Sequence, residues 1–248
     1  MSRESLTFDC VIMDRIVIGP GPVTSVPCFQ DGHAISPDRI VDLTEQEVIA
    51  WMLASEPCRS LFFSKICLAS GPYADSVLEL KFPLTLISQG GDLDFVMLEG
   101  GDPTRGVCVE FKKVKVRIDK QGEERINHLP ALETLIKQGN KRQSQGFRKS
   151  YICALAVVDA HEFRTPNTLT RGMGSPKVQA LFELGSMAGI HDDVGVLLIE
   201  MPQPTGKSFK DFIGFNICKV KEAGVLEQPA RLTEDLQALF RQSMKGQA

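Results

Sequence analysis

The sequence of 248 residues contains no apolar run near the roughly 20 residues that a membrane-spanning helix needs. Its seven cysteines include no Cys-x-x-Cys pair, and several lie in apolar runs, which predicts reduced, buried thiols rather than disulfides or a zinc site. The four histidines show no metal-ligand spacing. The first 14 residues lack the charged-then-apolar layout of a secretory signal. We therefore expect a cytoplasmic protein without a membrane partner.

Excess positive charge is also missing, since 28 Lys and Arg stand against 31 Asp and Glu, which argues against nucleic-acid binding by the whole surface. The charge is unevenly distributed, however. Residues 105–149 hold 12 Lys and Arg against 5 Asp and Glu. A basic segment on an acidic body is typical of a local anion-binding face. The basic residues that we expect to contact phosphates are Lys113, Lys115, Lys141, Arg142, Arg148 and Lys149.

Hydrophobic content of 43% and charged content of 24% are typical of a globular protein. We expect an N-terminal arm or hairpin at 1–43 packed on a core at 44–160, with an α/β extension of the same domain at 161–248. Thr44 and Glu47 form a capping-box pattern at the start of a helix. Three strands, a helix at 130–147 and a further apolar strand follow. This order predicts an α/β fold with a mixed central sheet and flanking helices.

The stretch "GVCVEFKKVKVRI" at 106–118 reads as a strand that carries charged residues. Side chains alternate between the two faces of a strand, so Glu110 and Lys112 share one face. After Lys112 the apolar positions change phase, because Val114 and Val116 are apolar where Glu110 and Lys112 are charged. This phase change predicts either a bulge or a strand that leaves the sheet at Lys112–Lys113, and bulges often accompany active sites.

On the preceding strand, Asp94 lies between Leu93 and Phe95 and therefore faces away from them. If the two strands are neighbours, Asp94 and Glu110 converge. Two adjacent carboxylates repel unless a cation neutralises them, and oxygen ligands of this kind suit Mg²⁺ or Mn²⁺. A nearby Lys112 could orient or deprotonate a water molecule, or stabilise charge on a phosphate.

The pair Gly-Asp-Leu-Asp-Phe-Val and Val-Cys-Val-Glu-Phe-Lys resembles the core of the PD-(D/E)xK nuclease superfamily, over about 44–160. Gln143 and Phe147 resemble the Gln-x-x-x-Tyr helix motif of one branch, with Phe in place of Tyr. The resemblance implies a restriction-endonuclease-like αβββαβ core. It also implies that Asp94 and Glu110 bind the metal, that Lys112 assists the water, and that Gln143 contacts the metal-bound water or the substrate.

The resemblance implies a metal-dependent nuclease that uses Mg²⁺ or Mn²⁺ and cleaves DNA rather than RNA, in genome maintenance or defence. Specificity would come from DNA structure, a homodimer or a partner protein. No proline precedes the aspartate, and we favour Asp94 over Asp92 because Asp94 lies within the strand. The superfamily often adds a helical glutamate, for which Glu47 and Glu56 are candidates.

Two alternatives remain open. Asp92, Asp94 and Glu110 could be the three metal carboxylates of a nucleotidyltransferase. That family needs a Gly-Ser turn about ten residues before the Asp-x-Asp motif, where this chain has "ELKFP". The second alternative is a catalytically inactive, nuclease-like protein that only binds or assembles.

Overall fold

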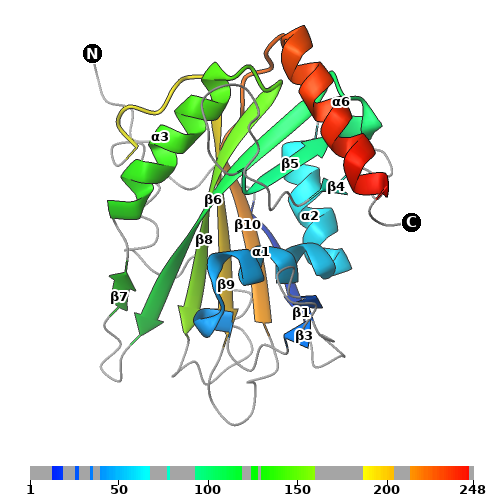
Figure 1. Cartoon of the computed structure of the whole chain (residues 1–248). Helices are drawn as coiled ribbons and strands as arrows, with labels where there is room; N and C mark the ends of the chain where they lie inside the picture. The colour runs from blue at the N-terminus through cyan, green and yellow to red at the C-terminus, as the bar shows by residue number, and fades with distance from the viewer. Residues whose placement is uncertain are drawn as a thin grey trace.

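The structure is a computed structural model (Figure 1), which describes residues 13–18, 26–27, 34–35, 40–67, 77–78, 93–118, 124–127, 130–159, 187–203 and 213–245. Its strands are β1 (Met13–Ile18), β2 (Val26–Pro27), β3 (Ala34–Ile35), β4 (Val77–Leu78), β5 (Phe95–Leu98), β6 (Gly106–Ile118), β7 (Glu124–Asn127), β8 (Lys149–Asp159), β9 (Val194–Gln203) and β10 (Ile213–Lys221). Its helices are η2 (Ile40–Asp42), α1 (Glu45–Ala54), α2 (Glu56–Ile66), η3 (Glu99–Gly101), α3 (Pro130–Ser144) and α6 (Ala230–Lys245). No helix in the described part of the chain is long and apolar enough to cross a membrane.

The central sheet has eight strands in the order β1-β10-β9-β8-β6-β5-β4, with β7 paired to part of β6. β8 is central and runs parallel to both of its neighbours, β6 and β9. The other pairs of this sheet, β1–β10, β10–β9, β4–β5, β5–β6 and β6–β7, are antiparallel. The predicted α/β class with a mixed sheet and flanking helices is confirmed. Within the expected N-terminal arm, β1 forms one edge of this sheet and β2 pairs with β3 separately. Of the expected extension at 161–248, the structure describes residues 187–203 and 213–245.

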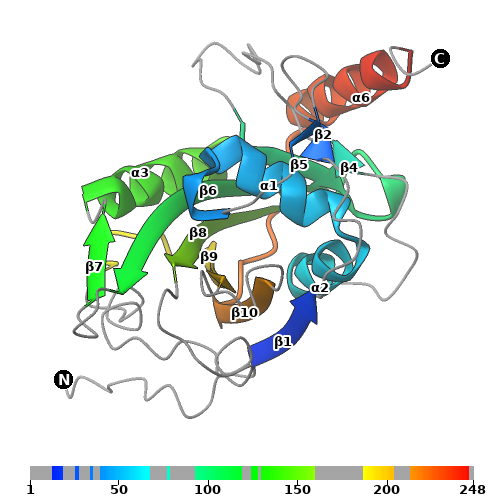
Figure 2. The same ribbon diagram turned by 90° about the horizontal axis from the view of Figure 1, so that it is seen from below.

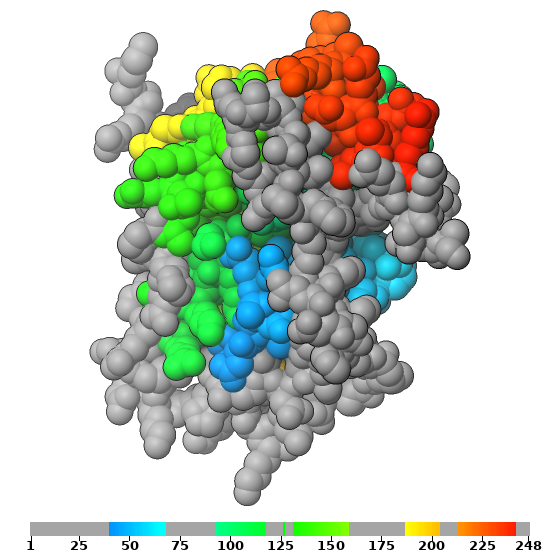
Figure 3. All heavy atoms as spheres, viewed as in Figure 1, coloured from blue at the N-terminus to red at the C-terminus, as the bar shows by residue number. Residues whose placement is uncertain are grey.

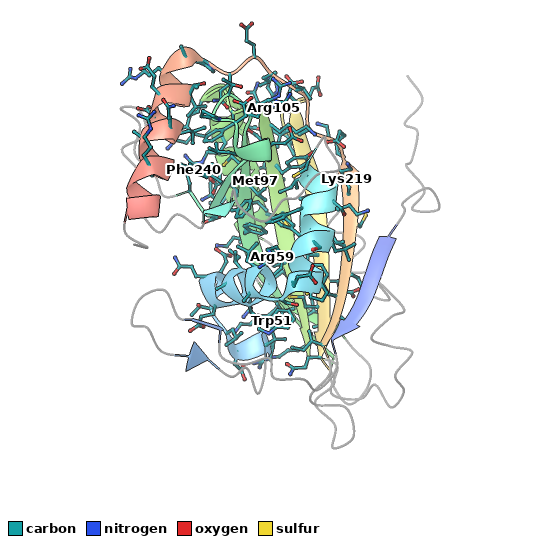
Figure 4. The ribbon with its side chains drawn as sticks, turned by 90° about the vertical axis from the view of Figure 1, so that its right-hand side faces the viewer. Trp51, Arg59, Met97, Arg105, Lys219 and Phe240 are labelled. Carbon is teal, nitrogen blue, oxygen red and sulfur yellow. The ribbon has the colours of Figure 1, made fainter. Side chains whose placement is uncertain are left out.

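Helices cover both faces of the sheet (Figures 1 and 2). α1 and α2 pack on one face around four aromatic rings, those of Phe62, Phe63, Phe95 and Phe111. α3 packs on the other face against β6, β8 and β9, and α6 packs against β5 and the start of β6. Arg59 of α2 donates a hydrogen bond to the Leu53 carbonyl of α1 at 3.1 Å, which ties the first two helices together (Figure 4).

The bulge predicted at Lys112–Lys113 is absent. β6 pairs with β8 in unbroken register from Val107 to Arg117, so its side chains alternate regularly throughout. The apolar pattern changes phase because the covered face changes along the strand. From Val107 to Phe111, α1 and α2 cover one face, and from Val114 onward α3 covers the opposite face. Glu110 and Lys112 therefore lie on the face of the sheet that α3 covers, and they precede Val114, where the apolar contacts with α3 begin.

The described cysteines are free, as the apolar surroundings predicted. Cys58, Cys108, Cys153 and Cys218 are buried, and Cys67 is half-buried. Burial raises the pKa of the Cys58 thiol to about 12, so it stays protonated at neutral pH. Cys10 and Cys28 lie outside the described residues.

Candidate active site

The candidate site lies where one edge of β6 has no strand partner among the described residues. β5 pairs with this edge as far as Val109, and β7 pairs with it only from Lys115. Two carboxylates bind the backbone in the gap. Asp94 Oδ2 accepts a hydrogen bond from the Phe111 N–H at 2.8 Å, and Glu45 Oε2 accepts one from the Lys113 N–H at 2.6 Å. Side-chain carboxylates thus replace the missing strand.

Asp94 lies opposite Glu110, as the sequence predicted, but it directly precedes β5 and is not within the strand. Phe95 pairs with Val109 in antiparallel register. Asp94, which precedes Phe95, therefore lies opposite Glu110, which follows Val109, on the same face of the sheet. The Glu110 side chain is fully buried, and its Oε2 atom has no hydrogen-bond partner among the described residues. A buried carboxylate oxygen without a donor is costly. A proton or a cation at this oxygen would remove the cost.

Both carboxyl groups have raised pKa values. The pKa of Glu110 is raised from 4.5 to about 7, chiefly by burial and then by the charge of Asp94, while Arg142 opposes the rise. Burial also raises the pKa of Asp94, and the Phe111 N–H opposes that rise. A proton placed between the two carboxyl groups would form a hydrogen bond between them. The pair therefore attracts positive charge.

Arg142 of α3 supplies one positive charge to this pair. Its Nε donates a hydrogen bond to Glu110 Oε1, and its side chain is only 4% exposed. The sequence had placed Arg142 among the surface phosphate contacts, and burial shows that it is not one in this structure. The helix residue that reaches Glu110 is thus Arg142. Gln143, which the resemblance implies as a contact to the metal-bound water or the substrate, is half-buried one position later.

Lys112 forms an ion pair with Glu45 of α1, with Nζ 3.2 Å from Oε2. The Lys112 side chain is 33% exposed and that of Glu45 is 26% exposed, so this pair lies between the buried carboxylates and the surface. In Figure 3, atoms of β6 reach the surface between those of α1 and α3. A substrate could approach the carboxylates from this side.

Of the glutamates in α1 and α2, it is Glu45, and not the expected Glu47 or Glu56, that contacts β6. Glu47 is held by the capping box, in which its Oε2 accepts from the Thr44 N–H at 2.6 Å. Glu56 accepts a hydrogen bond from Ser60 within α2. The signal was present in the capping pattern, because a glutamate that closes a capping box is already used. Asp92, the third acid considered, lies outside the described residues.

Lys113 fastens the start of α1 to β6. Its Nζ donates hydrogen bonds to the carbonyls of Val41, at 2.9 Å, and Leu43. Burial, followed by the charge of Lys115, lowers the pKa of Lys113 to about 8. The side chain is 6% exposed and points to a structural role rather than a phosphate contact. By holding the segment before α1, Lys113 positions Glu45 at the β6 edge.

The predicted basic face is therefore smaller than the sequence suggested. Lys113, Arg142 and Lys149 are buried, and Lys149 pairs with Glu222 at 3.1 Å. The expected phosphate contacts that are partly exposed are Lys115, Lys141 and Arg148.

Asp94 and Glu110 are the residues that fit a divalent cation. The described residues contain no group of three or more His, Cys, Asp and Glu arranged to hold a metal ion. An ion here would take its protein ligands from these two carboxylates, and water would complete its shell, as Mg²⁺ commonly allows. The unpartnered Oε2 of Glu110, opposite a second carboxyl group of raised pKa, supports this fit.

The sequence matches no family model and no curated protein. The geometry of the site alone therefore carries the functional proposal.

Proposed function

We propose that this chain is a metal-dependent nuclease of the PD-(D/E)xK type that hydrolyses phosphodiester bonds, in DNA rather than RNA. One observation carries the proposal. Glu110 is buried opposite Asp94 with one carboxylate oxygen unpartnered among the described residues, and the partly exposed Lys112 lies on the same face of β6. A buried pair of carboxyl groups costs the fold free energy unless a proton or a cation neutralises it.

The residues would divide the work as follows. Asp94 and Glu110 would hold Mg²⁺ or Mn²⁺, which when bound polarises a phosphate and lowers the pKa of water. Lys112, with its amine near the surface, would orient or deprotonate the attacking water. Glu45 positions Lys112 through the 3.2 Å ion pair and fixes the backbone of the next residue.

The order of elements also supports the proposal. α1 and α2 precede β4, β5 and β6, which form successive antiparallel pairs. α3 lies between β6 and its parallel neighbour β8 in the sequence. Apart from the additional strand β7, this order is similar to the αβββαβ order that the sequence resemblance implies. Many unrelated functions share similar α/β arrangements, so the fold supports the proposal less than the site does. Genome maintenance or defence would be the setting.

The charges are consistent with a phosphodiester substrate. Three carboxylates, from Glu45, Asp94 and Glu110, face two cationic side chains, from Lys112 and Arg142. A divalent cation would turn this net negative site into a net positive one. A phosphodiester carries one negative charge and would balance the excess.

The alternative is a nuclease-like protein that binds or assembles without catalysis. The Arg142–Glu110 ion pair favours this alternative, because an arginine already occupies one carboxylate oxygen that a metal would use. The nucleotidyltransferase alternative depends on Asp92, which lies outside the described residues. It remains a prediction of the sequence.

A cleavage assay with purified protein tests the proposal. Duplex and single-stranded DNA are incubated with Mg²⁺, Mn²⁺ or EDTA, using wild type, Asp94→Asn and Glu110→Gln, with Glu234→Gln on exposed α6 as the matched control. Metal-dependent cleavage by the wild type and the control, and by neither site variant, is expected. Equal cleavage by all four would place the activity elsewhere. Stabilisation by Mn²⁺ without cleavage of any substrate would favour the binding alternative.

A further inference from the structure

The contact between Arg142 and Glu110 is unusual because both side chains are almost completely buried. Nε of Arg142 donates to Glu110 Oε1, and Nη1 donates to Gln145 Oε1 at 3.3 Å. Buried ion pairs contribute little net stability, since desolvation offsets their attraction. The fold therefore gains little from keeping a charge at both positions.

The ion pair is also incomplete. Arg142 binds one oxygen of Glu110, and the other has no hydrogen-bond partner among the described residues. The Asp94 carboxyl group lies opposite, with its own pKa raised chiefly by burial. One guanidinium thus faces two acidic groups. A divalent cation between those groups would supply the second positive charge.

We propose that Arg142 is an internal counter-ion for Glu110, that a divalent cation displaces it, and that the displaced guanidinium then binds a phosphate of the nucleic acid. The inference rests on the proposed function and adds a role for α3 to it. The planar guanidinium suits this exchange, because it matches carboxylate and phosphate oxygens equally well.

The position of Arg142 supports the exchange. It lies in the last turn of α3, and its neighbours along the chain, Lys141 and Gln143, are partly exposed. Lys112 lies on the same face of β6, two residues beyond Glu110. A phosphate bound by Arg142 beside the cation would therefore lie near the residue that is proposed to assist the water.

The first test measures Mn²⁺ affinity by calorimetry and by thermal shift, at about pH 8.5 and without nucleic acid. The proteins are wild type, Arg142→Gln, Arg142→Lys and Lys137→Gln, the last removing an exposed charge elsewhere on α3. Removing the competing guanidinium should tighten Mn²⁺ binding on the order of tenfold, and Lys137→Gln should change it less than about twofold. Arg142→Lys should give a smaller increase and keeps the test available if Arg142→Gln does not fold.

The second test measures binding of a phosphorothioate DNA duplex, which resists hydrolysis, by fluorescence anisotropy with Mn²⁺ or with EDTA. Without the cation, Arg142 is engaged by Glu110, so Arg142→Gln should bind DNA as well as wild type. With Mn²⁺, the variant should bind about tenfold more weakly, because it lacks the released guanidinium. Lys137→Gln should show no such dependence on the cation.

The results separate the inference from the proposed function. Equal Mn²⁺ affinity in wild type, Arg142→Gln and Arg142→Lys, with wild type cleaving DNA, would overturn the exchange and leave the nuclease proposal standing. An equal loss of DNA affinity with Mn²⁺ and with EDTA would also overturn it. No Mn²⁺ binding by any variant would remove the proposed function and the exchange together.

Discussion

The Glu45 carboxylate of α1 accepts a hydrogen bond from the backbone N–H of Lys113 at 2.6 Å, at the point where β6 lacks a neighbouring strand among the described residues. A helix side chain therefore completes the edge of the sheet. The same carboxylate pairs with Lys112. Glu45 therefore contributes both to the fold and to the candidate site.

Glu45→Ala should lower both the free energy of unfolding and the rate of cleavage, whereas Glu47→Ala should lower only the free energy of unfolding. Loss of Glu45 leaves the Lys113 N–H without its acceptor and frees Lys112, at a cost of about 1–2 kcal/mol in the free energy of unfolding. Loss of Glu47 removes the capping box, at a similar cost of about 1 kcal/mol. Urea unfolding and cleavage assays measure the two effects. Normal cleavage by Glu45→Ala would show that Lys112 needs no positioning.

Glu110 predicts a fall in stability with rising pH. Its pKa is about 7 in the folded protein against an ordinary 4.5, so the folded state holds a proton that the unfolded chain has released between these values. The stabilisation is complete below about pH 4.5 and is lost as pH rises through about 7. The amide in Glu110→Gln cannot ionise. The variant should therefore lose on the order of 2 kcal/mol less free energy of unfolding than wild type as pH rises.

Urea unfolding at about pH 5 and pH 8 in EDTA measures the difference. Asp94, whose pKa is also raised, should leave a smaller residual dependence in Glu110→Gln. Saturating Mn²⁺ should reduce the fall in wild type, because a cation replaces the proton. Identical pH dependence in wild type and variant would contradict the raised pKa.

Lys112→Ala should separate chemistry from binding. The ion pair with Glu45 is partly exposed, so its loss should cost the fold no more than about 1 kcal/mol. Loss of the amine should lower the cleavage rate by about 10²–10⁴-fold if Lys112 assists the water, while DNA affinity changes only slightly. Lys137→Ala, at an exposed position of α3, is the control. A Lys112→Ala protein that cleaves normally would remove this residue from the mechanism.

The pairing of Asp94 with Glu110 could be predicted because a period of two along neighbouring strands determines which residues share a face. The bulge could not be rejected from sequence. A change of phase in apolar residues looks the same whether the strand slips or the covering helices change sides. The burial of Arg142 could not be predicted either, because it depends on how α3 is rotated against the sheet. Long-range packing determines that rotation, and the apolar stripe of the helix is weak.

The revised basic face predicts which lysines respond to salt. Lys115 and Lys141 are partly exposed, so replacing both with Ala should lower the slope of log affinity against log salt by roughly 1–2 for duplex DNA. Lys149→Ala should instead destabilise the protein, because Lys149 is buried against Glu222 and Tyr151. Replacing exposed Arg231 and Arg241 of α6 serves as the control. An unchanged slope in the Lys115/Lys141 variant would place the nucleic acid on another face.

Gly139 determines how closely α3 approaches the sheet and so whether Arg142 reaches Glu110. A methyl group at this position would lie 2.4 Å from Ile152 Cγ2 of β8 and 3.2 Å from Val194 Cγ1 of β9. Glycine to alanine inside a helix normally stabilises it by up to about 1 kcal/mol, but this overlap should outweigh the gain and cost about 1–3 kcal/mol. Gln138→Ala, at the preceding position on the same helix, should be nearly neutral.

The displacement of α3 should also weaken the contact between Arg142 and Glu110. Gly139→Ala should therefore bind Mn²⁺ more tightly than wild type, in the direction expected for Arg142→Gln, although the arginine is still present. Urea unfolding and Mn²⁺ calorimetry on the same samples measure both effects. A variant as stable as wild type would show that Ile152 moves aside, and the helix would then keep its position. A destabilised variant with unchanged Mn²⁺ affinity would mean that Arg142 follows Glu110 as the helix moves.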